Sequence, residues 1–335
     1  MLREADKYTY RVMRSDEDNE YIGLCAEFPG LSWLAASPEE ALKGIRATVR
    51  KCVKDLAKTG EPVPQALTTK KYSGKFMVRV PPEVHRQLAV KAAANGKKIT
   101  LEMGGKSPFI VLADANVDFA VDTAAFGIFL HQGQICMAGT RIIVEAPVYD
   151  EFCRKFAKKA AALKVGDPKD PTTVIGPLIS ASKCAGVDAL VQAAIKQGAR
   201  VVAGGKYDGP YYEPTVVIDV DNSMKIFYEE CFAPVVVVCK ARDHLEALAL
   251  ANDNEYGLSS AVMTNDMDKM MFFAQNLETG MTHFNHTTVY DEPHVPFGGV
   301  KNSGFGREGG HYSMEEMTEV KWITISGSTP HPYPF

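Results

Sequence analysis

The feature that most constrains the fold is an alternation of helical and strand patterns that begins near residue 99. Short runs of apolar and β-branched residues predict strands at 142–144, 200–203, 215–220, 234–239 and 259–263. Apolar residues recur at helical spacing over 152–163, 181–197, 243–253 and 266–278. Strands that alternate with helices in this way are typical of an α/β domain.

A loop that contains a cysteine lies early in this region. The stretch Gln132-Gly-Gln-Ile-Cys-Met-Ala-Gly-Thr-Arg141 is rich in glycine and small residues and follows an amphipathic segment at 119–130. This layout places the thiol of Cys136 at a helix-to-strand turn, where backbone N–H groups can point at a reacting atom. Upstream lies Glu102, in Leu101-Glu-Met-Gly-Gly-Lys-Ser-Pro108. Taken alone, such a cysteine is usually a small buried hydrophobe and such a glutamate a solvated surface residue.

Two further motifs complete a set of four. They are Tyr228-Glu-Glu-Cys-Phe-Ala-Pro-Val235 and Pro296-Phe-Gly-Gly-Val-Lys-Asn-Ser-Gly-Phe-Gly-Arg307. In this order the four motifs resemble the aldehyde dehydrogenase superfamily over about residues 99–325, which correspond to the later half of a family member. The resemblance implies the family's α/β catalytic domain with most of the Rossmann half missing. The segment 286–299 looks most like members that oxidise aromatic aldehydes such as benzaldehyde, salicylaldehyde or vanillin.

The resemblance also implies a role for each matched residue. Cys136 would add to the aldehyde carbonyl, with its own backbone N–H as an oxyanion donor, and hydride would pass to NAD or NADP. Glu102 would activate the water that hydrolyses the resulting thioester. Glu230 would hold the nicotinamide ribose hydroxyls, and Phe232 would lie beside the nicotinamide. Two alternatives stay open: Glu229 is the better-placed carboxylate, or Phe232 is simple core.

The part of the family that is missing here builds most of its cofactor-binding domain. We therefore expect weak cofactor binding and impaired turnover, because hydride transfer depends on positioning. Residues 316–325 resemble the family's final strand. An unpaired apolar strand invites association, so we expect a homo-oligomer.

A different pattern precedes residue 99. Residues 7–14 and 20–28 read as strands, and Ser37-Pro38-Glu39-Glu40 opens a helix with a capping box that Gly60 closes. The stretch Tyr21–Leu42 resembles the HicB family of antitoxins. This resemblance implies a small α+β domain over residues 1–68 that binds a HicA-type toxin through residues 1–60.

Residues 69–98 resemble part of a ribbon-helix-helix module. A strand is predicted at 74–80, followed by a helix that opens at Pro81 and closes at Asn95-Gly96. Residues 70–98 hold eight lysine and arginine residues against one glutamate, which fits a phosphate-contacting surface or, equally well, a solvated basic helix. The second helix of the module does not follow, so we expect operator binding to be weak or absent.

Composition and charge bear on the partners of the chain, its compartment and the kinds of site it can hold. Residues 1–98 hold 18 lysine and arginine residues against 12 acidic ones, whereas residues 99–335 hold 19 against 29, which hints at different partners. No apolar run spans a bilayer and no signal peptide is visible. Seven cysteines without a CxxC pair suggest neither disulfides nor a zinc site, and a reducing cytoplasm fits. The tail 326–335 is expected to be loose.

Other candidate residues have simpler interpretations. His283 and His286 lie near the expected substrate tunnel but lack metal-ligand spacing. The pattern G-x-G-x-x-G at 304–309 lacks the strand that dinucleotide binding requires before it. Structural roles are expected for Cys25, Cys52, Cys153, Cys184, Cys231 and Cys239. The rival interpretations of the whole chain are an antitoxin-like binding protein with an inert fusion, and a chance or artificial join of two fragments.

Overall fold

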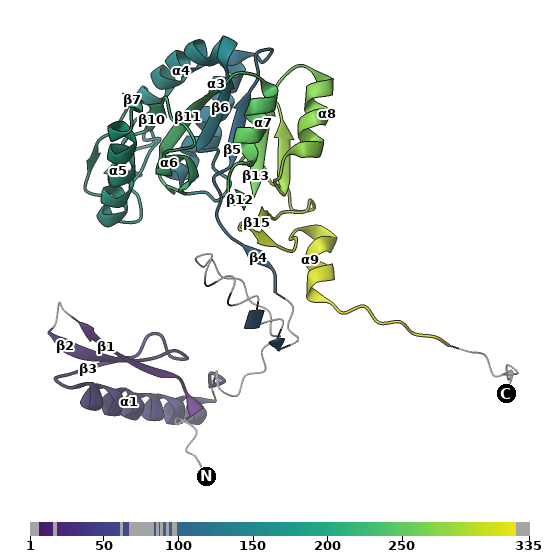
Figure 1. Cartoon of the computed structure of the whole chain (residues 1–335). Coiled ribbons are helices and arrows are strands. Elements are labelled where there is room, and N and C mark those ends of the chain that lie inside the picture. Colours follow the sequence, from purple (N-terminus) through teal and green to yellow (C-terminus); the bar gives the residue numbers. More distant parts are fainter. Residues whose placement is uncertain are drawn as a thin grey trace, which may run out of the picture. The chain divides into compact units, whose positions relative to one another are not determined.

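The structure is a computed structural model that describes residues 7–15, 19–60, 63–66, 84, 87, 90, 91, 94, 95 and 99–325. Its internal contacts divide the chain into two compact units, residues 1–74 and residues 75–335, and each is described by itself (Figure 1). The strand predicted at 74–80 and the tail 326–335 lie outside the described residues, as does most of the segment 69–98.

The described residues of unit 1 (residues 1–74) form a three-stranded antiparallel sheet and one long helix. The sheet order is β1 (Tyr10–Ser15), β2 (Glu20–Cys25), β3 (Ser32–Ala35), and α1 (Pro38–Thr59) packs on one face. Gly23 permits this close packing, because a Cβ at this position would overlap the carbonyl oxygen of Ala41 in α1. The core of the unit is formed by Tyr8, Cys25, Phe28, Ile45, Val49 and Ala66.

The predicted ends of α1 are confirmed. The Ser37 hydroxyl accepts the backbone N–H of Glu40, and Pro38 occupies the first turn. Gly60 ends the helix in the left-handed conformation, with φ of 76°.

Unit 2 (residues 75–335) is built on a seven-stranded sheet of order β14-β13-β5-β6-β11-β10-β7. Neighbouring strands are parallel, except that β7 is antiparallel to β10. This arrangement confirms the predicted α/β class. The strands are β5 (Pro108–Val111), β6 (Arg141–Glu145), β7 (Arg200–Ala203), β10 (Thr215–Ile218), β11 (Val235–Ala241), β13 (Ser259–Met263) and β14 (Met281–Phe284).

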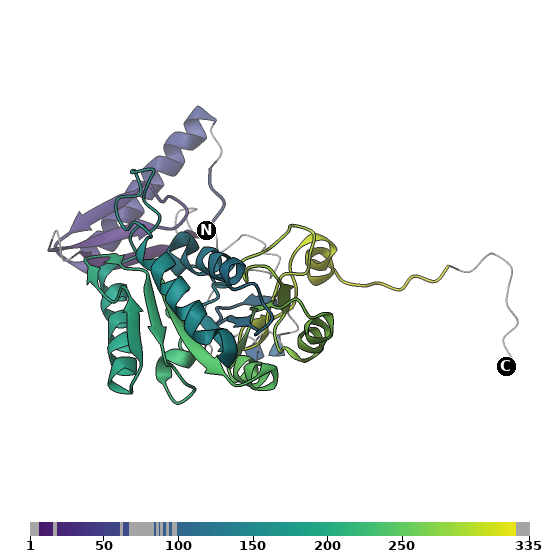
Figure 2. The same cartoon turned by 90° about the horizontal axis from the view of Figure 1, so that it is seen from above.

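Helices cover both faces of this sheet (Figures 1 and 2). On one face, Val236 and Val238 of β11 pack in a cluster with α3 (Val117–Phe129) and α4 (Ala146–Ala161). The opposite face carries α5 (Ala181–Lys196), α6 (Lys225–Tyr228), α7 (His244–Asn252) and α8 (Met267–Asn276). Burial on both faces explains why these strands are continuously apolar rather than alternating.

Short elements connect the sheet to the later motifs. Strand β4 (Leu101–Glu102) pairs with β16 (Gly304–Phe305), and β12 (Tyr256–Gly257) pairs with β15 (Val300–Lys301). These ladders hold the segment 300–305 against residues 101–102 and 256–257. The remaining elements are the 3-10 turn Leu130–Gly133, the hairpin β8 (Tyr207–Asp208) with β9 (Tyr211–Tyr212), and α9 (Gly310–Met317).

The strand expected at 316–325 is not formed. Helix α9 continues to Met317, and residues 318–325 extend away from it without regular structure (Figure 2). Val320 and Trp322 are 101% and 91% exposed. A strand needs a neighbour for its backbone hydrogen bonds, and none of the described residues offers one here.

Within the described part of the chain, every helix is too short or too polar to cross a lipid bilayer.

Asp114 ties the end of β5 to the connection between β13 and α8. Its carboxylate accepts the Thr264 hydroxyl and the Asn265 backbone N–H, each at 2.6 Å, and pairs with Lys269 at 3.0 Å. Burial alone would raise the pKa of Asp114, but these hydrogen bonds outweigh it and lower the pKa to about 2.

We predict that Asp114 makes the stability of unit 2 fall at acid pH. The folded pKa lies below the ordinary value of 3.8, so the carboxylate stabilises the fold above pH 3.8 and loses this effect as the pH falls toward 2. Urea unfolding should show wild type losing about 2 kcal/mol more than Asp114→Asn between pH ~6 and pH ~2. Equal losses in the two proteins would contradict the prediction.

Candidate active site

The segment Glu102–Ser107 connects β4 to β5 and contacts the other three sequence motifs. It meets the 296–307 motif first. Glu102 lies opposite Gly304 in the β4–β16 ladder, and the Met103 N–H donates to the Ser303 carbonyl. The Ser303 hydroxyl is fully buried and donates to the carbonyl of Gly104 at 2.8 Å. One carboxylate oxygen of Glu102 is enclosed by the surrounding protein.

The same segment meets the 228–235 motif through two glycines. The backbone N–H of Gly105 donates to Oε1 of Glu230 at 3.0 Å. A Cβ on Gly104 would overlap the Glu230 carboxylate, so only glycine allows this approach. Glu229, by contrast, is exposed and lies 3.5 Å from Lys225. Of the two candidate carboxylates, Glu230 is therefore the one that faces the Glu102–Ser107 segment.

Cys136 is half-buried and follows a strained turn. His131, Gln132 and Gly133 take positive φ values of 49°, 59° and 69°, a run of left-handed residues that is costly for side chains other than glycine. Cys136 then packs beside Met137, Leu258 and Met281. Backbone strain of this kind persists only where the surrounding structure imposes it, and it is common at functional sites.

Two glycine contacts hold the Cys136 loop in place. A Cβ on Gly105 would lie 3.3 Å from the Cys136 carbonyl oxygen, so the Glu102–Ser107 segment also contacts the nucleophile candidate. Gly133 is pressed against the Ala233 carbonyl so closely that a Cβ there would overlap it. The structure thus brings together the four motifs that the sequence separates by up to about 200 residues.

Phe232 is half-buried and lies outside the fully buried core. Its φ is 50°, in the left-handed region that a bulky residue rarely adopts. A side chain that only filled the core would not require this backbone conformation. Its position next to Cys231 and Ala233, both buried, fits a side chain held at the rim of the site.

Two buried cations contact the motifs of the site, and sequence reasoning missed them because only their place in the motifs marked them. Lys106 and Arg141 are each 1% exposed, and no carboxylate of the described residues lies within ion-pair distance of either. Lys106 Nζ contacts the Cys231 thiol at 3.8 Å. Arg141 donates to the carbonyls of Lys106, Leu250, Ala251 and Asp253 and stacks on Phe227. Burial lowers the pKa of Arg141 to about 10.

Five of the other six cysteines are buried, which fits the structural role expected of them. Cys25, Cys153, Cys184, Cys231 and Cys239 are buried, and Cys52 is half-buried in α1. Burial raises the pKa of Cys153 and of Cys239 to about 12, which keeps both thiols protonated and unreactive.

The described residues offer no cluster of three or more histidine, cysteine, aspartate or glutamate side chains that could hold a metal ion. The G-x-G-x-x-G pattern includes β16, a two-residue antiparallel strand outside the main sheet, so the context for dinucleotide binding is absent there.

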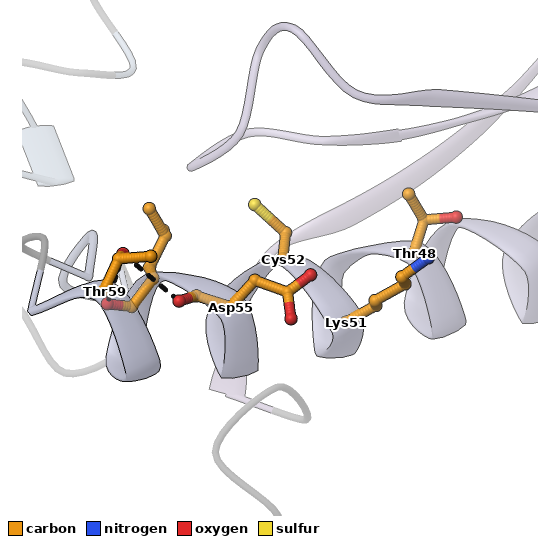
Figure 3. A pocket seen from close by; sticks show the side chains of 6 residues that line it. Thr48, Lys51, Cys52, Asp55 and Thr59 are labelled. Carbon is orange, nitrogen blue, oxygen red and sulfur yellow. Dashed lines mark hydrogen bonds between the residues drawn. The ribbon is translucent and has the colours of Figure 1, made fainter.

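A hollow of about 300 Å³ lies along α1 in unit 1 (Figure 3). Its lining comes from one face of a single helix, and the predicted site residues are elsewhere. The lining residues are Thr48, Lys51, Cys52, Asp55, Leu56 and Thr59.

Comparisons with known proteins agree with the geometry of unit 2. The model of the aldehyde dehydrogenase family matches residues 43–323. A vanillin dehydrogenase of Pseudomonas fluorescens is 43% identical over 251 residues, which cover 75% of this chain and 52% of that protein. A benzaldehyde dehydrogenase of Bacillus subtilis is 47% identical over 239 residues, which cover 71% of this chain and 49% of that protein.

Solved structures give the same result. A salicylaldehyde dehydrogenase from Pseudomonas putida G7, complexed with salicylaldehyde, superposes with a TM-score of 0.74 at 37% identity and covers 91% of this chain and 59% of that one. The chain spans about half the length of the curated relatives it matches.

We predict that the contact of Gly133 with Ala233 is essential to the Cys136 loop. In Gly133→Ala the new Cβ would overlap the Ala233 carbonyl at a positive φ, which should cost about 3 kcal/mol or more in unfolding free energy. Gly186→Ala is the control, because Gly186 lies on the exposed face of α5 with nothing within 4 Å of its Cβ position. That variant should be stabilised by up to about 1 kcal/mol. Similar stability of the two variants in urea unfolding would refute the prediction.

Proposed function

The chain belongs to the aldehyde dehydrogenase family, and on this premise we propose that unit 2 oxidises an aromatic aldehyde to its carboxylic acid with NAD or NADP as hydride acceptor. The observation that carries the proposal is the convergence of four motifs on the segment Glu102–Ser107. That segment joins the Glu230 carboxylate, the Cys136 loop and the Ser303 hydroxyl. A nucleophile, a candidate base and a ribose-binding carboxylate are the side chains that this reaction needs.

The residues present fit the nicotinamide end of the cofactor. Glu230 already accepts one N–H from Gly105, and a carboxylate has room for about four hydrogen bonds, so two ribose hydroxyls can share it. Phe232 is half-buried, and its ring would offer a face for the nicotinamide. When bound there, the nicotinamide supplies a hydride acceptor.

The chain's own residues would perform the remaining steps. The Cys136 thiolate adds to the aldehyde carbon, and its backbone N–H stabilises the oxyanion that forms. After hydride loss, the acyl group is left as a thioester on Cys136. Glu102 then takes a proton from water, the resulting hydroxide attacks the thioester, and the carboxylic acid and the Cys136 thiolate are released. The apolar side chains around Cys136 limit the access of other water molecules.

Similarity to vanillin, benzaldehyde and salicylaldehyde dehydrogenases supports an aromatic substrate. The surroundings of Cys136 also favour an aromatic substrate, because Leu258, Val289 and Phe297 give the thiol apolar neighbours that suit a ring.

The exposed apolar side chains within residues 320–325 support the expectation of a homo-oligomer.

A second proposal concerns unit 1, which we suggest binds a HicA-type toxin through residues 1–60. The supporting observation is an apolar row on the sheet face opposite α1. Gly23 faces the helix, so its neighbour Ile22 faces away, and the strand register places Met13 and Leu34 beside Ile22. Met13 and Leu34 are 49% and 43% exposed, which is typical of a protein-binding surface.

We predict that purified protein forms NADH when NAD and benzaldehyde are supplied. Cys136→Ala should lose activity on the order of a thousandfold or more, since the nucleophile is gone. Glu102→Gln should produce about one NADH per chain and then stop, because the thioester forms but is not hydrolysed.

The control is Cys52→Ser, which removes a half-buried thiol from unit 1 and should leave turnover unchanged. Turnover that survives in Cys136→Ala would eliminate the proposed nucleophile. Steady turnover in Glu102→Gln would assign the base to another residue.

For unit 1 we predict co-purification with at least one member of a panel of HicA-type toxins. Leu34→Asp should abolish the complex, because a charge would be placed in the apolar row. Ala47→Asp adds the same charge on an exposed position of α1 and should leave the complex intact. If no toxin in the panel binds, or if both variants behave alike, this second proposal fails.

A further inference from the structure

Three rings form a cluster close in the chain sequence to residues that pack with Cys136, and one ring nitrogen has no hydrogen-bond partner. The rings belong to His283, His286 and Tyr290, with centroid separations of 6.4 Å, 5.9 Å and 4.3 Å for the pairs His283–His286, His283–Tyr290 and His286–Tyr290. The function proposed above uses none of these side chains.

Strand geometry places His283 on the same side as Cys136. Successive side chains of a strand point to opposite faces, so Met281 and His283 of β14 share one face. Met281 packs in the cluster that contains Cys136, whereas Phe284 packs on the other face with Ile110 and Leu112. From the other direction, Val289 joins the Cys136 cluster, and the adjacent Tyr290 contacts the His283 ring.

The Nε2 atom of His283 is enclosed and makes no hydrogen bond in the structure. Enclosed polar atoms in proteins nearly always have a partner, and exceptions point to a bound water, ion or ligand. Desolvation, reinforced by the neighbouring His286, lowers the pKa of His283. The imidazole is therefore neutral near neutral pH, with one nitrogen that donates and one that accepts.

We propose that His283 is a specificity-determining residue that hydrogen-bonds a hydroxyl group on the ring of a phenolic aldehyde. This inference rests on the proposed function, since it assumes that the aldehyde carbon is held at Cys136. His286 and Tyr290 supply aromatic surface for the substrate ring, and His283 supplies the polar partner that distinguishes a hydroxylated ring from an unsubstituted one. A site with one buried polar group discriminates in this way, because the unsubstituted ring leaves that group unpaired.

The test compares equilibrium binding of 2-, 3- and 4-hydroxybenzaldehyde with that of benzaldehyde by calorimetry. The whole chain is used with Cys136→Ala, so that covalent addition to the thiol does not contribute. At least one hydroxylated ring should bind roughly tenfold more tightly than benzaldehyde, the size expected for one good hydrogen bond. His283→Phe keeps a ring but removes the nitrogen, and it should abolish this preference.

His244→Phe is the matched control, because His244 also stacks edge-on against an aromatic ring, that of Phe272, on the α7–α8 side of the sheet. It should keep the preference. Should His283→Phe fail to fold, the ¹⁵N signal of His283 in the otherwise unaltered chain gives the answer, because the preferred hydroxylated ring should shift it and benzaldehyde should not.

Equal binding of all four rings, no binding of any, or a preference that survives in His283→Phe overturns the inference. The outcome is separate from that of the proposed function, which is judged by NADH formation in the chain that retains Cys136. A chain that discriminates the rings but forms no NADH would keep the inference about ring recognition and refute the proposed oxidation.

Discussion

The geometry of the candidate site depends on the close approach of the backbone segment Glu102–Ser107 to two loops, which contain Cys136 and Glu230. At Gly104 the main chain passes so near to Glu230 that a Cβ would overlap its carboxylate, and at Gly105 a Cβ would lie in tight contact with the Cys136 carbonyl oxygen. Glycine provides this approach at an entropic cost in the unfolded chain, which the contacts on both sides must offset. Everything that the catalytic proposal needs is arranged around these two residues, so the geometry of the pair Gly104-Gly105 limits that of the whole site.

Two cations in or beside this segment, Lys106 and Arg141, are buried. Both are enclosed, and among the described residues neither forms an ion pair with a carboxylate, although Asp253 acts on Arg141 electrostatically. Burying an unpaired ion normally costs several kcal/mol. Arg141 is compensated by four backbone carbonyls, and its side chain therefore joins the Glu102–Ser107 segment to the end of α7. Lys106 contacts Cys231, the residue between Glu230 and Phe232. Lys106 thus connects the Glu102–Ser107 segment to the loop that would meet the cofactor, and replacing Arg141 by a neutral residue would leave several carbonyl acceptors without their donor.

The sequence was sufficient to predict the α/β class and five of the seven strands of the sheet, but it missed β5 and β14 and the connections between the motifs. Strands 259–263 and 200–203 both appear where expected. The first is buried on both faces, whereas the second lies at the edge of the sheet and is partly exposed. The placement of Glu230 rather than Glu229 required coordinates, since adjacent carboxylates look alike in a sequence. The contact of Gly133 with Ala233, a hundred residues apart in sequence, and the partnerless nitrogen of His283 carry no local signal at all. The strand expected at 316–325 does not form for a related reason. A strand needs a partner strand for its backbone hydrogen bonds, and the sequence pattern describes only one of the two strands.

The nucleophile loop and the loop expected to meet the cofactor are mechanically coupled. The left-handed run at His131, Gln132 and Gly133 is a high-energy conformation, and it is maintained where Gly133 meets the Ala233 carbonyl. Ala233 directly follows Phe232, so a shift of the Phe232 loop would release the constraint that positions Cys136. Because Gly105 contacts both the Cys136 carbonyl and Glu230, the backbone of the Cys136 loop is held from two directions by elements that, under the proposed function, also determine where a nicotinamide would sit. The same contacts in unit 2 would therefore preorganise both Cys136 and the end of the site that would hold the cofactor. They do so in a chain that spans about half the length of its curated relatives.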